Sequence, residues 1–359
     1  MKGSNSSSPD LQNHSMNQTA GDNCSDSMPV PLSQDFFQSL VVGEKVMVVV
    51  SCLVVLATLA VFVDVAVYVV RRYSTSNDHK AKTLQILSIF PGISLIAMFS
   101  LLIPKSCVLC EQATFLYISA SMYSFVSLLF VYTGGKDKVV QCLTANKIRL
   151  QSPPCCCCCC CCLSYEVTRE NVQRLTLLVA QNAYLQPLLA FVSLALWLDD
   201  KFTIGKIDVS NGYPYILILS QTSFLFGLYG LFMLFELCKE ALKPLFIAPK
   251  FFLIQFVIIL TLLQGSIFGT FSKYNMPSCR GILSSAVRGR TYYLIALIIQ
   301  FLLLMIISRY FYRRPQNNVN FEISAETDEM PNHDSSMHKL MDKMEQPEAE
   351  KDLGVESKN

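Results

Sequence analysis

The chain has 359 residues, of which 52% are hydrophobic and 16% are charged, with a mean hydropathy of +0.39 and a formal net charge of +2. A soluble domain of this size carries about a quarter charged residues, so the composition argues against a soluble globular protein. The small net charge gives no sign of a nucleic-acid partner, and we expect none.

The N-terminal segment 1–45 is polar and carries four glycosylation sequons. They lie at Asn5, Asn13, Asn17 and Asn23. Because sequons are modified only on the lumenal side, they predict an extracellular, glycosylated and disordered tail. A chance cluster in a segment rich in Ser and Asn is the alternative.

Seven apolar blocks follow, each close to the roughly 20 residues that a helix needs to cross a hydrocarbon core. They lie at about 46–70, 84–103, 107–133, 175–198, 213–237, 251–272 and 292–312. None shows the ten-residue alternation of a membrane barrel. We therefore predict an all-α polytopic membrane protein, with seven transmembrane helices in a domain over 46–312.

Lysine and arginine residues are concentrated in the loops 71–83, 134–174 and 238–250. Because positive residues favour the cytoplasmic side, this distribution predicts an outer N-terminus and a cytoplasmic C-terminus. The final segment 313–359 is acidic and poor in aromatic residues. We expect it to be a disordered cytoplasmic tail.

Two acidic residues fall inside the predicted spans. A charge in the middle of a bilayer costs roughly 2.5 to 3.5 kcal/mol on insertion scales, so a charge that persists there faces a partner or a cavity. Asp64 shares a helix face with Ala60 and Tyr68 in the first span, and Glu111 lies one turn into the third. We expect both to serve helix packing or gating; snorkelling to the interface is the alternative for Glu111.

Eight consecutive cysteines lie in the predicted cytoplasmic loop 134–174. They are Cys155, Cys156, Cys157, Cys158, Cys159, Cys160, Cys161 and Cys162. Adjacent cysteines cannot all meet disulfide geometry, and zinc sites need wider spacing. Thiols beside the inner leaflet are suited to S-palmitoylation, and each buried methylene adds about 0.8 kcal/mol of anchoring. The alternative is an unmodified apolar loop that rests on the membrane.

Several polar side chains lie at membrane depth in spans four to six. The fourth span contains Gln181, Asn182, Tyr184 and Gln186 just before a proline. Gln221 lies in a polar patch of the fifth span, and Gln264 precedes two glycines in the sixth. This concentration favours a wet cavity, although hydrogen bonds between helices would also account for it.

Motifs for enzymatic chemistry are missing from the sequence. It has no phosphate-binding loop, His-Glu-X-X-His site, serine elbow or Asp-His-His-Cys signature, and none of its four histidines lies in a predicted span. We expect no enzyme activity, no cofactor and no metal. A seven-helix receptor or a membrane scaffold remains the alternative class, although Asp-Arg-Tyr and Asn-Pro-X-X-Tyr switches are missing as well.

Short segments along the membrane domain carry a family resemblance. They are FVDVAVYVVRR, IPKSCVLCE, GGKDKVV, the cysteine run, QNAYLQ, LQGSIF and SRYFYRR. In this order they resemble the alpha subunit of the organic solute transporter family. The longer polar N-terminus and acidic C-terminus depart from the family pattern, so the resemblance extends to a divergent, alpha-like member as well as to a true alpha subunit.

The resemblance implies facilitated, sodium-independent movement of bile acids, conjugated steroids and similar amphipathic organic anions. It also implies a single-span beta subunit as partner and a basolateral plasma membrane location, with the endoplasmic reticulum as the location of unpartnered chains.

For such an anion we expect an apolar path with a few polar groups. The expected lining is Gln181, Asn182, Tyr184, Gln186, Gln221 and Gln264, with Arg174 and Lys250 attracting the anionic group at the inner mouth. Asp64 and Glu111 would repel an anion and are assigned to structure or gating.

Overall fold

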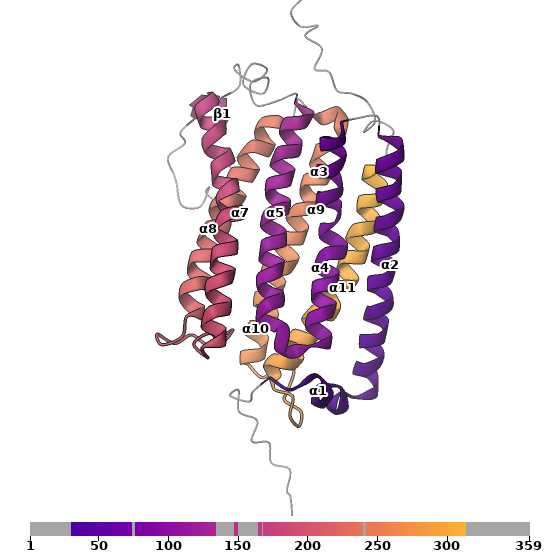
Figure 1. Cartoon of the computed structure of the whole chain (residues 1–359), viewed down its shortest axis with the longest axis vertical. Helices are drawn as coiled ribbons and strands as arrows, with labels where there is room; N and C mark the ends of the chain where they lie inside the picture. The colour runs from indigo at the N-terminus through magenta and orange to yellow at the C-terminus, as the bar shows by residue number, and fades with distance from the viewer. Residues whose placement is uncertain are drawn as a thin grey trace, which may run out of the picture.

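The computed structural model of this chain describes residues 30–73, 76–133, 147–149, 164–166, 168–239 and 242–313. These residues form a bundle of long helices that run side by side (Figure 1). The cysteine run 155–162, the four sequons and the tail from 314 lie outside the described residues. Predictions about acylation, glycosylation and the C-terminal tail therefore stay predictions.

Seven helices among the described residues are long and apolar enough to cross a membrane, which confirms the predicted number. A short helix α1 (Ser33–Ser39) precedes them. The seven spans are α2 (Val42–Arg72), α3 (Asn77–Leu87) with α4 (Ile89–Leu102), η1 (Pro104–Ser106) with α5 (Cys107–Tyr132), α7 (Arg169–Leu198), α8 (Tyr213–Cys238), α9 (Ile247–Ile259) with η4 (Leu260–Gln264) and α10 (Gly265–Lys273), and α11 (Ser285–Tyr312). The short helix η3 (Lys243–Leu245) lies between α8 and α9.

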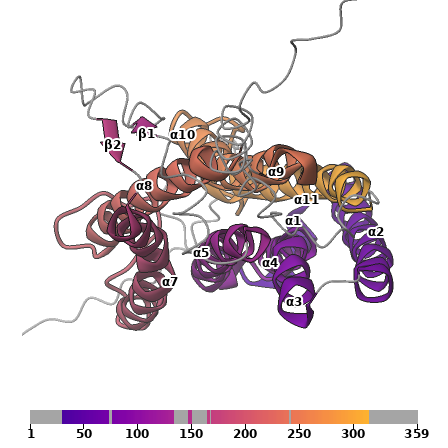
Figure 2. The ribbon, with the colours of Figure 1, turned by 90° about the horizontal axis from the view of Figure 1, so that it is seen from above.

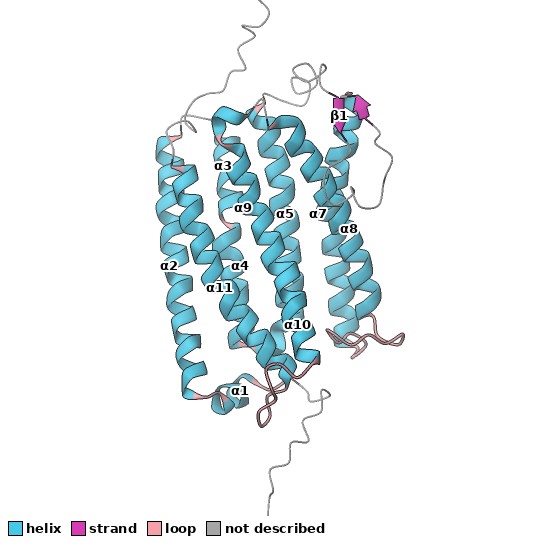
Figure 3. Ribbon diagram, turned by 180° about the vertical axis from the view of Figure 1, so that it is seen from behind, coloured by secondary structure: helices cyan, strands magenta, loops and turns pink. Residues whose placement is uncertain are grey.

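Two short strands, β1 (Lys147–Arg149) and β2 (Ser164–Glu166), pair antiparallel on either side of the cysteine run. The sequence did not predict them, because three residues are too few to show the alternation by which a strand is recognised. The strands lie at the end of the bundle opposite to α1 (Figures 1 and 3). We call these two ends the β-strand end and the α1 end.

The second span begins earlier than the predicted residue 84. Ser76 caps α3 by accepting a hydrogen bond from the backbone N–H of His79, and the polar first turns of this helix hide it from a hydropathy scan. His79 is buried, with its ring 4.8 Å from that of Tyr132. The prediction that no histidine lies in a span is therefore wrong.

The last span also begins earlier than predicted, at Ser285 instead of 292. The hydroxyl of Ser284 accepts a hydrogen bond from the N–H of Val287 and caps the helix. This brings Arg288 and Arg290 into the first turns of the span, where they form ion pairs.

Each long helix packs against particular neighbours in the bundle. The helix α7 packs along α8 and α5, and α11 packs against α2 and α4. Viewed from above, α7 and α8 lie at one side of the bundle and α2 at the other, with α9 and α11 adjacent (Figure 2). Inside the bundle, the rings of Phe235 and Phe251 stack 4.0 Å apart.

Close contact between α7 and α8 depends on small residues. A Cβ atom at Gly230 would lie 2.9 Å from the carbonyl oxygen of Leu175, and a Cβ at Gly227 would lie 2.0 Å from the amide of Asn182. Since lipid is as apolar as leucine, packing of this kind, and not water exclusion, holds membrane helices together.

Candidate functional site

The buried amides of α7 are used to hold α8. Asn182 is 0% exposed and accepts a hydrogen bond of 2.5 Å from the hydroxyl of Ser223. Gln186 is 1% exposed, and its Nε2 donates to the hydroxyl of Ser220 at 3.0 Å. These contacts are the hydrogen bonds between helices that the sequence offered as the alternative to a wet cavity.

The remaining polar residues predicted in spans four and five do not converge on this interface. Tyr184 is 75% exposed on the surface of α7, and Gln181 and Gln221 are half-buried. Arg174 is exposed and forms an ion pair of 3.8 Å with Glu170. A turn of 100° per residue distributes such neighbours around a helix, which is why these side chains differ in burial; their place in a solute path stays a prediction.

Lys250 is fully buried at the β-strand end of the bundle. Its Nζ lies 3.3 Å from the hydroxyl of Tyr132, and it lies over the rings of Tyr132 and Tyr312 at 5.3 and 5.0 Å. Tyr73 also contacts this cluster, because its hydroxyl donates to the carbonyl of Tyr312 at 2.7 Å. The sequence predicted Lys250 and Arg174 at the inner mouth of the path; in the structure the lysine is buried and the arginine is exposed.

Asp64 joins the first span to the last. Its carboxylate lies 2.8 Å from Nε of Arg309 and 3.2 Å from Nη1 of Arg313. Tyr68, one turn further along α2, donates its hydroxyl to the carbonyl of Arg313 at 3.0 Å. The carboxylate of Asp64 is thus paired with positive charge from the last span, and its assignment to structure or gating stays a prediction.

Glu111 is paired in a similar way at the α1 end. It lies 3.6 Å from Arg290, whose other Nη donates to the carbonyl of Cys107 at 3.1 Å. A neighbouring pair that the sequence missed joins Glu44 to Arg288 at 3.1 Å. The only signal for Glu44 was its place in the first turn of α2, where a carboxylate suits the helix N-terminus.

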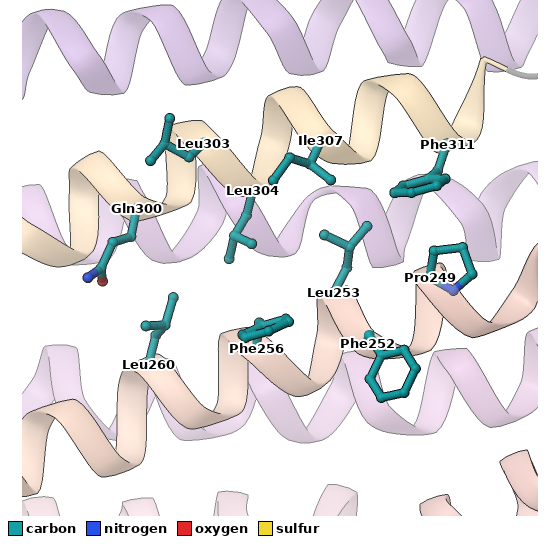
Figure 4. A pocket seen from close by; sticks show the side chains of 10 residues that line it. All are labelled: Pro249, Phe252, Leu253, Phe256, Leu260, Gln300, Leu303, Leu304, Ile307 and Phe311. Atoms are coloured by element: carbon teal, nitrogen blue, oxygen red, sulfur yellow. The ribbon is translucent and has the colours of Figure 1, made fainter.

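A groove of about 570 Å³ lies between α9 and α11. Its lining is apolar except for one amide, and Figure 4 shows Leu253, Leu260, Leu304 and Ile307 between the two helices. The lining residues are Pro249, Phe252, Leu253, Phe256, Leu260, Gln300, Leu303, Leu304, Ile307 and Phe311. The volume lies within the roughly 300 to 1,000 Å³ of sites for small organic ligands.

This groove opens along the surface of the bundle, because Phe252, Phe256 and Leu303 are each about half exposed. The sequence did not reveal it. Its residues recur every three or four positions on two apolar helices, and the same pattern describes a helix face against lipid. The only distinguishing signal was Gln300, a polar residue in an otherwise apolar stretch.

A π-helical turn borders the groove. The segment η4 begins at Leu260, which lines the groove, and contains Gln264, which is half-buried. The hydroxyl of Tyr293 donates to the carbonyl of Thr261 at 3.0 Å and so supports the distorted turn. Single π turns inside α-helices are frequent at functional sites.

The family profile and the most similar curated proteins cover most of the chain and point to the same family. The profile of the family described as organic solute transporter Ostalpha matches residues 46–317. A Bos taurus protein named organic solute transporter subunit alpha is 29% identical over 300 residues, which cover 83% of this chain and 88% of that protein.

Proteins of the same name from other mammals are similar. The one from Mus musculus is 30% identical over 281 residues, covering 78% of this chain and 81% of that protein. The one from Homo sapiens is 29% identical over 299 residues, covering 83% and 87%. No solved structure matches the chain. With seven spans and this profile, the chain belongs to the organic solute transporter Ostalpha family of multi-pass membrane transporters.

Proposed function

We propose that this protein is a subunit of a facilitative, sodium-independent transporter of bile acids, conjugated steroids and related amphipathic organic anions. It works as a heteromer with a single-span beta subunit in the plasma membrane, on the basolateral side of polarised cells. Its relatives are named as alpha subunits, which supports a partner subunit.

The groove between α9 and α11 is the observation that carries this proposal. An amphipathic solute has a rigid apolar body that needs an apolar surface and only a few polar contacts. The groove offers hydrocarbon on both helices and one amide, from Gln300. Because several of its residues are exposed on the side of the bundle, a solute can enter from the bilayer as well as from water.

Charge around the groove suits an anion. Pro249 and Phe311 line the β-strand end of the groove, and each is followed by a residue of the buried cluster of Lys250 and Tyr312. Lys250 is fully buried and does not line the groove, so in our proposal its positive charge acts on the anion from behind the groove wall. Asp64 and Glu111 are paired with arginines, so neither presents an uncompensated carboxylate to an anion.

Gln264 is the second amide that we assign to the path. It lies in the π-helical turn next to the groove, and its Oε1 is buried without a hydrogen-bond partner in the described part of the chain. We retain Gln181 as a further candidate on α7, because it is half-buried and none of the hydrogen bonds that join α7 to α8 involves it.

The membrane orientation in this proposal has a glycosylated N-terminus outside and the cysteine run inside. Acyl chains on Cys155–Cys162 would then anchor the loop and add apolar surface near the path. Endoglycosidase mobility shifts test the sequons, and hydroxylamine-sensitive acyl exchange tests the cysteines. A cysteine run that is labelled from outside intact cells would contradict this orientation.

Uptake with and without a beta subunit tests the function. We expect cells that express both chains to take up taurocholate or estrone sulfate without a sodium gradient, and to lose the solute again when its removal from the medium makes the gradient point outward. Signalling through an intracellular partner with no net flux would instead favour a receptor and overturn the proposal.

A further inference from the structure

Gln300 is the one polar residue among those that line the α9–α11 groove. Its Oε1 is buried and has no hydrogen-bond partner among the described residues. Figure 4 shows the side chain extending from α11 toward α9, on the side of Leu260. A buried polar atom without a partner costs about 1 to 3 kcal/mol, so its presence calls for an explanation.

The side chains that line the groove provide no donor to this amide. The other nine lining residues have hydrocarbon side chains. Backbone N–H groups in the middle of α11 are used within the helix itself. The missing partner is therefore best supplied by a molecule that occupies the groove.

A hydroxyl group is the partner that fits this amide best. It donates to a carboxamide oxygen and accepts from a carboxamide N–H, so it satisfies the side chain in either orientation of the amide. A ketone or ether oxygen can only accept, and a methyl group can do neither.

The dimensions of the groove place the hydroxyl at one end of the ligand. Its lining runs from Pro249 to Leu260 on one side and from Gln300 to Phe311 on the other, which is eleven helical steps on each side. At a rise of 1.5 Å per residue, this is about 16 Å. Gln300 and Leu260 lie at one end, and Pro249 and Phe311, which precede Lys250 and Tyr312, lie at the other.

We propose that Gln300 is a specificity-determining residue that selects rigid apolar solutes with a hydroxyl group at the end remote from their anionic group. The hydroxyl binds the Gln300 amide, the ring system lies along the apolar walls, and the anionic group lies at the end of the groove lined by Pro249 and Phe311. This inference rests on the proposed transport function, because it assigns the substrate class of the same groove.

A matched pair of solutes tests the selection. The pair is estradiol sulfate, with its sulfate on the phenolic ring, and the analogue that lacks the hydroxyl of the five-membered ring. We expect the co-expressed wild type to prefer the hydroxylated solute by about five- to tenfold in kcat/KM, the range of one neutral hydrogen bond. Gln300→Leu should abolish the preference by lowering uptake of the hydroxylated solute alone.

Two further variants control for folding and for amide chemistry. Gln300→Asn keeps the amide but shortens its reach by one methylene, and we expect it to lose the preference as well. Gln255→Leu removes an amide whose Oε1 is also buried without a partner but which does not line the groove. This control should keep the wild-type preference at equal surface expression.

Ligand-induced thermal stabilisation of the purified wild type and Gln300→Leu separates this inference from the transport function. We expect estradiol sulfate to stabilise the wild type more than the analogue does, and the two to act alike on Gln300→Leu. That result without any flux would overturn the transport function and leave the selection in place. Two results would overturn the selection. One is equal stabilisation of the wild type by both solutes, as expected for a groove filled by lipid chains. The other is transport in which Gln300→Leu keeps the wild-type preference for the hydroxylated solute.

Discussion

The α7–α8 interface and the α9–α11 groove differ in whether the oxygens of their buried amides have hydrogen-bond partners. At the interface, the amide oxygens of Asn182 and Gln186 accept hydrogen bonds from serines of the facing helix, although Nδ2 of Asn182 is buried without a partner in the described chain. In the groove, the amide oxygen of Gln300 is buried among hydrocarbon without a partner in the described chain. A concentration of polar residues in a membrane helix therefore marks packing here, and a solitary amide beside an apolar groove marks the candidate binding site.

Filling the groove should have the largest effect. Leu303→Trp with Ile307→Trp places two indoles on half-exposed positions of the groove wall, so we expect uptake to fall by more than about tenfold, equivalent to about 1.4 kcal/mol of lost binding. Uptake normalised to surface protein measures this. The matched control, Leu219→Trp with Leu225→Trp, changes exposed leucines of α8 that do not line the groove and should leave uptake intact. An equal loss of uptake in the groove variant and in the α8 control would show that the effect is not specific to the groove.

Overpacking the α7–α8 interface should lower the stability of the protein. Gly230→Ala drives a Cβ against the carbonyl of Leu175, and we expect a loss of about 1 to 3 kcal/mol in the free energy of unfolding. Gly269→Ala is the control, because nothing lies within 4 Å of its Cβ position and alanine favours the helix. Thermal unfolding in detergent compares the two. If Gly269→Ala loses as much thermal stability as Gly230→Ala, the close contact between Gly230 and Leu175 is not the cause of the loss.

Removing an interface amide should have a smaller effect. Asn182→Leu loses one hydrogen bond between helices and Gln186→Leu loses two, and such a bond is worth about 0.6 to 2 kcal/mol in a membrane. We expect lower thermal stability and unchanged uptake per surface molecule. A fall in uptake per molecule without a stability change would restore these residues to the solute path.

Tyr184→Phe should have the smallest effect. The tyrosine is exposed on α7, and its hydroxyl makes no hydrogen bond to another described residue. We expect uptake and melting temperature to equal those of the wild type. A marked decrease in uptake would place α7, and not only the groove, in the path.

The number of spans could be predicted from the sequence because about 20 apolar residues in a row have few other uses. The need of Asp64 for a partner followed in the same way, but Arg309 could not be identified, since it lies 245 residues away and only the packing of α11 on α2 brings the two together. The early starts of the second and last spans were missed because capped, polar first turns resemble loops.

The candidate site was less accessible to sequence reasoning. Polar residues of α7 drew attention because they are conspicuous against an apolar background, although their contacts lie within the bundle. The groove residues are apolar on two helices distant in sequence, and nothing in their spacing separates a binding wall from a lipid-facing surface. Only the three-dimensional pairing of α9 with α11 reveals the hollow between them.

Photoaffinity labelling tests most directly whether the α9–α11 groove carries the solute. A photoreactive steroid sulfate should label peptides within 249–260 and 300–311, and excess estrone sulfate should suppress the labelling. Suppressible labelling confined to 181–186 and 220–223, with none on α9 or α11, would contradict the account.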